Sequence, residues 1–191
     1  MKRVALQLIA CLAMLLALSG CFFKTADDQY ALPELPEDYK QLQVKLDEVM
    51  NELEAEYAAP LSGYNTATVQ LQDLDGDGDS ESTIAFFRVN SNEQPLCICI
   101  FRQRADGTYG VDYTLRGDGT AIDSINYVDV DGDGMKEILV SWQISARVHT
   151  LTAYQLGVED AIELVHTAYN ESFTVFDLDR DNQQELLVLQ T

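Results

Sequence analysis

The sequence predicts an all-β protein in which the strands follow one amphipathic helix. Three observations predict this fold class: apolar and polar residues alternate in short segments from Ala67 onward, turn residues separate these segments, and one acidic loop pattern occurs three times. The loops begin at Asp73, Asp129 and Asp177, about fifty residues apart, which is the length of one four-stranded β-propeller blade. We therefore expect antiparallel sheets of the propeller-blade type.

The first twenty residues have the composition of a secretory signal peptide. Met1–Arg3 is basic, Val4–Leu18 carries no charge, and small residues precede Cys21. This arrangement resembles the lipobox of bacterial lipoproteins, in which the cysteine carries the lipid. The alternative is an uncleaved anchor in which Cys21 is an ordinary residue. We expect residues 1–20 to be removed and Cys21 to be lipidated, which anchors the chain on the extracytoplasmic face of the cell membrane.

A linker and a helix follow the predicted anchor. Residues 21–36 contain charged residues and two prolines, a composition typical of an exposed linker. An amphipathic helix is predicted over residues 37–59, with Pro60 and Gly63 closing it. Its apolar stripe, at alternating steps of four and three, is Leu35, Tyr39, Leu42, Leu46, Val49, Leu53 and Tyr57. The stripe is either a coiled-coil seam or a face that packs on the following domain, and its short length favours packing.

The predicted β domain covers residues 64–191. Its expected strands are Thr83–Val89, Leu96–Arg102, Tyr109–Leu115, Ser124–Val128, Ile138–Gln143, Val148–Gln155, Ile162–Tyr169, Phe173–Phe176 and Leu186–Gln190. Counted from one acidic loop to the next, these strands make about two and a half blades, which is too few to close a ring. We expect a truncated version of a longer propeller, with an open stack of blades capped by the helix, or closure by self-association, as the alternatives.

The three acidic loops have the residue types of a calcium site. Carboxylates at positions 1, 3, 5 and 9 of a nine-residue loop converge on one point, and the backbone carbonyl of position 7 adds an oxygen. The predicted ligands are Asp73, Asp75, Asp77, Asp79 and Glu81; Asp129, Asp131, Asp133, Met135 and Glu137; and Asp177, Asp179, Asp181, Gln183 and Glu185. Because all of these ligands are hard oxygens, the loops favour about three Ca²⁺ ions over zinc or copper.

The residues around the loops separate this site from an EF-hand. An EF-hand places a glutamate at position 12 and a helix after the loop, but position 12 here is Ile84, Val140 or Val188, inside an apolar run typical of a strand. Glycine at position 6 permits a positive φ, and Asn182 replaces it in the third loop. The alternative is that the loops are hairpin turns without metal.

The loops resemble the calcium loops of FG-GAP and VCBS-type repeats, which occur in integrin-like β-propellers. The resemblance covers about residues 66 to 191, and it implies metal ligands at positions 1, 3, 5, 7 and 9 of each loop. Together with the lipobox, it resembles VCBS-repeat lipoproteins, for which it implies no established activity. One departure from the pattern, Ser82 and Thr83 between Glu81 and the first apolar residue, leaves the strand register of the first repeat open.

The charge of the chain and its lack of catalytic motifs argue against nucleic-acid binding and catalysis. With 12 basic and 32 acidic residues and a net charge of −20, the chain lacks the basic stripe of a nucleic-acid-binding protein. No nucleophile elbow or phosphate loop occurs, and His149 and His166 lie in predicted strands, so we expect no enzyme. Cys97 and Cys99 are expected to be buried free thiols. The predicted function is calcium-stabilised binding of an extracellular protein or glycan, and a glycan-acting lipoprotein is the alternative.

Overall fold

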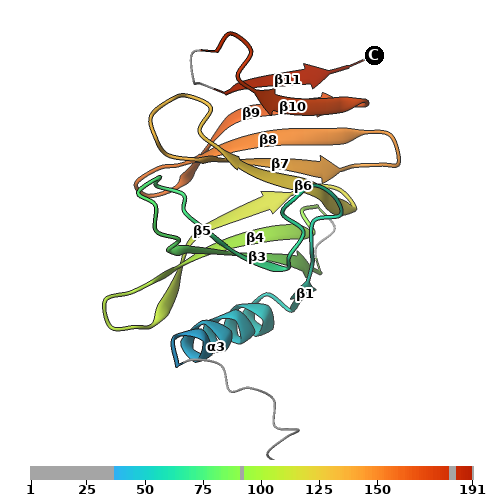
Figure 1. Cartoon of the computed structure of the whole chain (residues 1–191). Helices are drawn as coiled ribbons and strands as arrows, with labels where there is room; N and C mark the ends of the chain where they lie inside the picture. The colour runs from blue at the N-terminus through green and yellow to red at the C-terminus, as the bar shows by residue number, and fades with distance from the viewer. Residues whose placement is uncertain (1–36, 91–92, 181–183, 191) are drawn as a thin grey trace, which may run out of the picture. The chain divides into compact units, whose positions relative to one another are not determined.

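The computed structural model describes residues 37–90, 93–180 and 184–190, and the predicted signal peptide, Cys21 and linker lie outside these residues. One helix and the β-strands of this part of the chain are labelled in Figure 1. They are α3 (Glu37–Glu52), β1 (Ala55–Tyr57), β2 (Val69–Gln72), β3 (Ser82–Val89), β4 (Leu96–Gln103), β5 (Tyr109–Gly117), β6 (Ala121–Val128), β7 (Glu137–Gln143), β8 (His149–Leu156), β9 (Ala161–Tyr169), β10 (Ser172–Phe176) and β11 (Glu185–Leu189).

The strands form three antiparallel sheets. Sheet A has the order β1-β3-β4-β5, and β2 also pairs with β3; sheet B has the order β6-β7-β8-β9; sheet C is the hairpin β10-β11. Sheet B and the β2 to β5 part of sheet A each follow the chain as a simple meander of four strands. No sheet closes on itself, so the fold is mostly β with open antiparallel sheets.

Side chains that alternate along the strands divide the core into layers. Figure 1 shows α3 and the three sheets stacked one after another. On β3, Ile84 and Phe86 face sheet B, whereas Ala85 and Phe87 face the helix. Sheet B repeats the alternation, since Ile138 and its i+2 neighbours pack on sheet A while Leu139 packs toward sheet C. The layers are therefore α3, sheet A, sheet B and sheet C, in that order along the chain.

Helix α3 is shorter than the sequence predicts. It ends at Glu52 rather than at residue 59, because Glu54 takes a positive φ of 48° and β1 then pairs with β3. Tyr57, predicted on the helical stripe, lies in β1. Pro60 and Gly63 do not end the helix, and the β domain begins at Ala55 rather than at residue 64. Pairing with an existing sheet edge thus replaces the last turns of a marginal helix.

The apolar stripe of α3 packs on the domain that follows it. Leu42, Leu46 and Val49 are buried in one cluster with residues of β3 and β4, including Phe87 and Phe101. The prediction that the stripe covers the following domain is confirmed in the described residues.

All nine predicted strands are present, and each end lies within three residues of its predicted position. The sequence did not predict β1 or β2, which are short and pair on the same edge of β3. The strand that precedes each acidic loop belongs to the same sheet as the strand that follows it. A repeat counted from loop to loop therefore spans two sheets, because the loop itself is the hairpin connection inside one sheet.

Candidate metal centres in three acidic loops

Each acidic loop joins the first and second strands of a meander or hairpin. Loop 1 (73–81) connects β2 to β3, loop 2 (129–137) connects β6 to β7, and loop 3 (177–185) connects β10 to β11. In every loop the carboxylates offer oxygens that lie within 4.8 Å of one another. These groups are Asp73, Asp75, Asp77 and Glu81; Asp129, Asp131 and Glu137; and Asp177, Asp179 and Glu185. Positions 1, 3 and 9 converge in all three loops.

The same backbone hydrogen bonds curl each loop. The carboxylate at position 1 accepts from the amide at position 4, at 2.7 Å from Gly76 to Asp73, at 2.7 Å from Gly132 to Asp129 and at 2.5 Å from Arg180 to Asp177. In loops 1 and 2, position 3 accepts from position 5 and position 5 accepts from position 7. These bonds hold the side chains with their oxygens turned to one point.

Positions 4 and 6 of loops 1 and 2, and position 4 of loop 3, take the left-handed backbone conformation. At position 6, Gly78 and Gly134 have φ of 97° and 92°, as the sequence predicts. Position 4 was not predicted to need it: Gly76 and Gly132 have φ of 74° and 78°, and Arg180 takes 69° in loop 3. A side chain with a Cβ is strained in this conformation, so loop 3 carries a cost that loops 1 and 2 avoid.

Glu137 at position 9 of loop 2 is the most constrained carboxylate of the three loops. Its residue is completely buried, and Oε2 accepts a hydrogen bond of 2.8 Å from the Val130 amide. Oε1 is buried without a hydrogen-bond partner among the described residues. Burial raises the pKa of Glu137, the Val130 amide lowers it, and the charges of Asp131 and Asp133 raise it again. A buried carboxylate oxygen without a partner, next to other carboxylates, fits a bound cation.

Not every predicted ligand belongs to these groups. Asp133, at position 5 of loop 2, lies outside the convergent group, and its oxygens accept from the Met135 amide and from Gln155. Asp79 and Met135 at position 7 were predicted to contribute backbone carbonyls, and their amides donate to position 5. Asp181 and Gln183 lie outside the described residues.

Loop 1 differs from the other loops in its strand register. The residue before the loop pairs with position 9 in loop 2 (Val128 with Glu137) and in loop 3, but with position 10 in loop 1 (Gln72 with Ser82). Glu81 therefore precedes β3 and is only partly buried, and its Oε1 accepts from Ser82. This shift resolves the register that the sequence left open.

Loops 1 and 2 touch each other, which the sequence did not predict. The Lys136 side chain reaches from loop 2 to the Asp73 carbonyl at 2.8 Å and to its carboxylate at 3.4 Å, and the Lys136 amide donates to the Leu74 carbonyl. A Cβ added to Gly76 would lie 2.2 Å from the Gly134 carbonyl oxygen. Nothing in the sequence marks a contact between residues 63 positions apart.

Lys136 and the loop amides set the charge state of Asp73. Partial desolvation raises the pKa of Asp73, but hydrogen bonds from the Gly76 and Gly78 amides and the Lys136 charge outweigh it, so the net shift is downward. Gln155 on β8 covers loop 2 in a similar way, donating to Asp131 at 3.1 Å. Both side chains come from outside the loop that they contact.

Two cysteines and a tryptophan are buried outside the loops. Cys97 and Cys99 are buried free thiols with their sulfurs 3.7 Å apart, as predicted. The hydrogen bond between them and burial raise the pKa of Cys99, which keeps that thiol protonated. Trp142 is buried in the core between sheets A and B, and its indole donates to Thr152. Among the described residues, no helix is long and apolar enough to cross a membrane.

Comparison with known proteins gives no relative. No family model, no curated protein and no solved structure matches the chain.

Proposed function

We propose that the chain is a non-catalytic lipoprotein of the cell surface, in which about three Ca²⁺ ions stabilise a stack of propeller-type blades. Sheets A and B would be blades with four meander strands each, sheet C a half blade, and α3 the cap of the stack. The blades would present loops to an extracellular protein or glycan. Cys21 would carry the lipid that anchors the domain on the extracytoplasmic face of the membrane.

The buried oxygen of Glu137 is the observation that carries the calcium proposal. A hairpin turn without metal has no reason to bury a carboxylate oxygen without a partner beside two further carboxylates. The donor set of loop 2 contains hard oxygens and no nitrogen or sulfur, which suits Ca²⁺. Asp129, Asp131 and Glu137 would hold the ion, whose positive charge would offset theirs, since the Lys136 side chain of loop 2 reaches Asp73 of loop 1 instead.

The other two loops support the same role because their acids converge at matching positions. Binding of an ion only to the folded state stabilises that state by mass action. Extracellular calcium modules have dissociation constants of about 10⁻⁴ to 10⁻³ M. The calcium is therefore structural in this proposal, and the binding of partners is left to other surfaces.

Calcium titration of the mature chain carrying Cys21→Ser tests the proposal. Calorimetry is expected to give about three bound ions, and the melting temperature is expected to be higher in calcium than in chelator. Magnesium and zinc serve as comparison ions, and each is expected to bind more weakly. A protein that melts at one temperature in calcium and in chelator would refute the calcium role.

Asp131→Ala sharpens this test at a single loop. The variant is expected to lower the melting temperature in calcium but much less in chelator, because Asp131 acts through the ion. Glu159→Gln is the matched control, since Glu159 is an exposed acid outside the three loops. Equal losses in both buffers would assign Asp131 a role without metal.

A further inference from the structure

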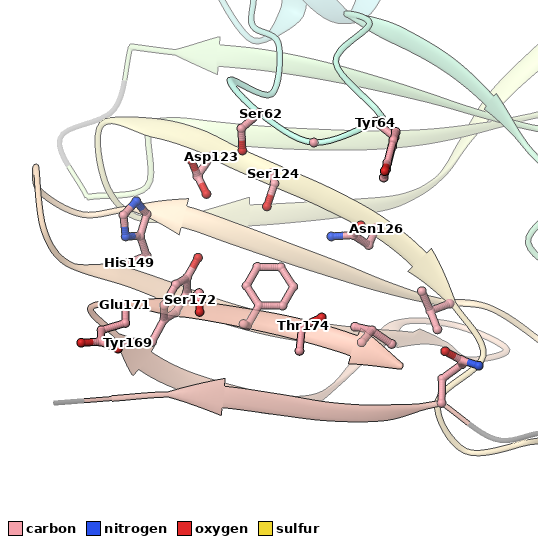
Figure 2. Close-up of a pocket in the computed structure, with 15 residues that line it drawn as sticks. Ser62, Tyr64, Asp123, Ser124, Asn126, His149, Tyr169, Glu171, Ser172 and Thr174 are labelled. Carbon is pink, nitrogen blue, oxygen red and sulfur yellow. The ribbon is translucent and has the colours of Figure 1, made fainter. Parts of the chain in front are cut away.

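A groove of about 550 Å³ lies between β6 of sheet B and β10 of sheet C (Figure 2), and Gln184 of loop 3 also lines it. Segment 62–64 borders it on one side, and His149 and Tyr169 border it at the ends of β8 and β9. Its volume is in the range of small-molecule sites, which is about 300 to 1,000 Å³. The groove is therefore large enough for a small ligand.

A β-bulge aims two neighbouring side chains into the groove. The register of β6 with β7 shifts between Ile122 and Ser124, so Asp123 has no partner in the ladder. In a regular strand, Asp123 and Ser124 would point to opposite faces. Both line the groove instead, and Figure 2 shows them beside Asn126 on the same strand. Bulges commonly re-aim side chains in this way at binding sites.

The polar side chains of β6 are left with unused hydrogen-bonding capacity. Ser124 is only 6% exposed, yet its hydroxyl makes no hydrogen bond among the described residues. The Asn126 amide is also without a side-chain partner there, and Asn126 lines the same groove. Partly buried polar groups of this kind are usually satisfied by a partner. A ligand with hydroxyl groups would satisfy both residues.

Side chains beside the groove contact one another in the absence of a ligand. The Tyr169 and Ser141 hydroxyls are 2.6 Å apart, and Ser141 donates to Asp123 at 3.3 Å. The His149 ring stacks on Tyr169 with centroids 5.2 Å apart, and Phe173 packs edge-on against Tyr169 at 5.7 Å. Aromatic rings with fixed polar neighbours suit ligands that carry both apolar faces and hydroxyls. Preorganisation of this kind reduces the entropy lost on binding.

The charge of the groove narrows the ligand class. Asp123 and Glu171 line it, and no Lys or Arg is among its lining residues. In a chain with a net charge of −20, these carboxylates repel phosphates, sulfates and uronic acids. Hydroxyl and amide groups beside aromatic rings, without a cation, instead match a neutral sugar.

We propose that this groove binds a neutral oligosaccharide. The Asp123 carboxylate accepts hydrogen bonds from sugar hydroxyls, Ser124 and Asn126 both donate and accept them, and Phe173 contacts a sugar ring. This inference names a ligand class for the binding role proposed above and rests on that role. It does not depend on the metal centres, because no loop carboxylate lines the groove.

Isothermal titration calorimetry of the mature chain carrying Cys21→Ser, in calcium, tests the inference. The probes are cellotetraose, maltotetraose, mannotetraose and xylotetraose, with tetragalacturonate as an anionic probe and the deacetylated glucosamine tetramer as a cationic probe. At least one neutral probe is expected to bind with a Kd below about 1 mM. Binding of a charged probe alone, or of no probe, overturns the inference.

Two variants tie the binding to the groove. Asn126→Ala and Ser124→Ala are each expected to weaken binding of that probe about tenfold, while Asn51→Ala on the exposed face of α3 leaves it unchanged. Melting curves in calcium check that all variants fold. Binding that is unchanged in both groove variants contradicts the site, whereas a missing calcium response with intact sugar binding would refute only the metal proposal.

Discussion

Loop 2 and loop 3 carry the same acidic pattern in different tertiary surroundings. Both use the position 9 glutamate to accept from the position 2 amide, Glu137 from Val130 and Glu185 from Leu178. Loop 2, however, buries its glutamate, has glycine at position 4 and rests against loop 1 through Lys136. Loop 3 has the strained Arg180 at position 4 and belongs to a two-stranded sheet.

Convergence of the carboxylates is therefore a local property of each loop. The hydrogen bonds from positions 4 and 2 form in either setting, because they join residues of one short loop. The tertiary structure holds the site in place, because the burial of Glu137 and the contact between loops 1 and 2 depend on residues outside loop 2. We therefore expect loop 2 to be the more preorganised metal site. Four variants test this difference, and the largest expected effect comes first.

Gly76→Ala is expected to be the most damaging change in the loops. A Cβ at this position would lie 2.2 Å from the Gly134 carbonyl oxygen and would also sit at a positive φ, so loops 1 and 2 must separate. The expected loss is about 2 to 4 kcal/mol in the free energy of urea unfolding. Gly78→Ala is the matched control, because its φ is positive but no atom lies within 4 Å of the added Cβ. A similar loss in both variants would show that backbone strain, and not the contact between loops, is decisive.

Glu137→Gln is expected to have opposite effects with and without calcium. In chelator at neutral pH the variant should gain about 1 to 3 kcal/mol, because it removes a buried carboxylate whose pKa burial has raised. In calcium the same variant should no longer bind the ion of loop 2, and it should lose most of the stability that this ion gives to the folded state. Melting curves in both buffers measure this crossing.

The pH dependence of the same variant gives an independent check. Because the pKa of Glu137 is raised in the folded protein, the folded state binds its proton more tightly than the unfolded state. In chelator, wild-type stability from this group should therefore increase as the pH falls through that pKa, and Glu137→Gln should lack the increase. If Glu137→Gln changed the melting temperature in the same direction in calcium and in chelator, a ligand role for Glu137 would be contradicted.

Lys136→Met removes the tie between loops 1 and 2. Without calcium we expect a loss of about 1 kcal/mol, since a charged donor to the Asp73 carbonyl and carboxylate is gone. Loop 1 should then bind calcium more tightly, because a positive charge near its ligands has been removed. Urea unfolding in chelator measures the loss of stability, and calorimetric titration with calcium measures the affinity of loop 1. Lys45→Met on α3 is the control for both measurements. A weaker calcium response in Lys136→Met would oppose this account.

Arg180→Gly is expected to give the smallest effect and to make loop 3 more like loop 2. Glycine adopts the φ of 69° without the cost that a side chain incurs, so the folded state should gain about 1 kcal/mol. Part of this gain is lost because glycine makes the unfolded chain more flexible. Thermal unfolding in calcium measures the shift. A loss of stability would mean that the Arg180 side chain makes a contact worth more than the strain.

The strands and the loop acids follow from the sequence because both depend on residues close together in the chain. Period-two alternation and turn residues are local signals that predict the strand from Ile138. The spacing of the acids within loop 2 is also local, and it predicts that their side chains converge. The early end of α3 could not be predicted. Its apolar stripe continues to Tyr57, and only pairing of β1 with β3 decides that Ala55 leaves the helix.

Thus the sequence by itself determined a mostly β chain with one helix and three acidic loops whose carboxylates converge. The tertiary structure alone decided which sheet each strand enters, that α3 covers sheet A, that Lys136 joins two loops and that a bulge at Asp123 opens onto a groove. The physical reason is the range of the interactions. Backbone turns and strand alternation are fixed within a few residues, whereas packing and strand pairing join residues far apart in the chain.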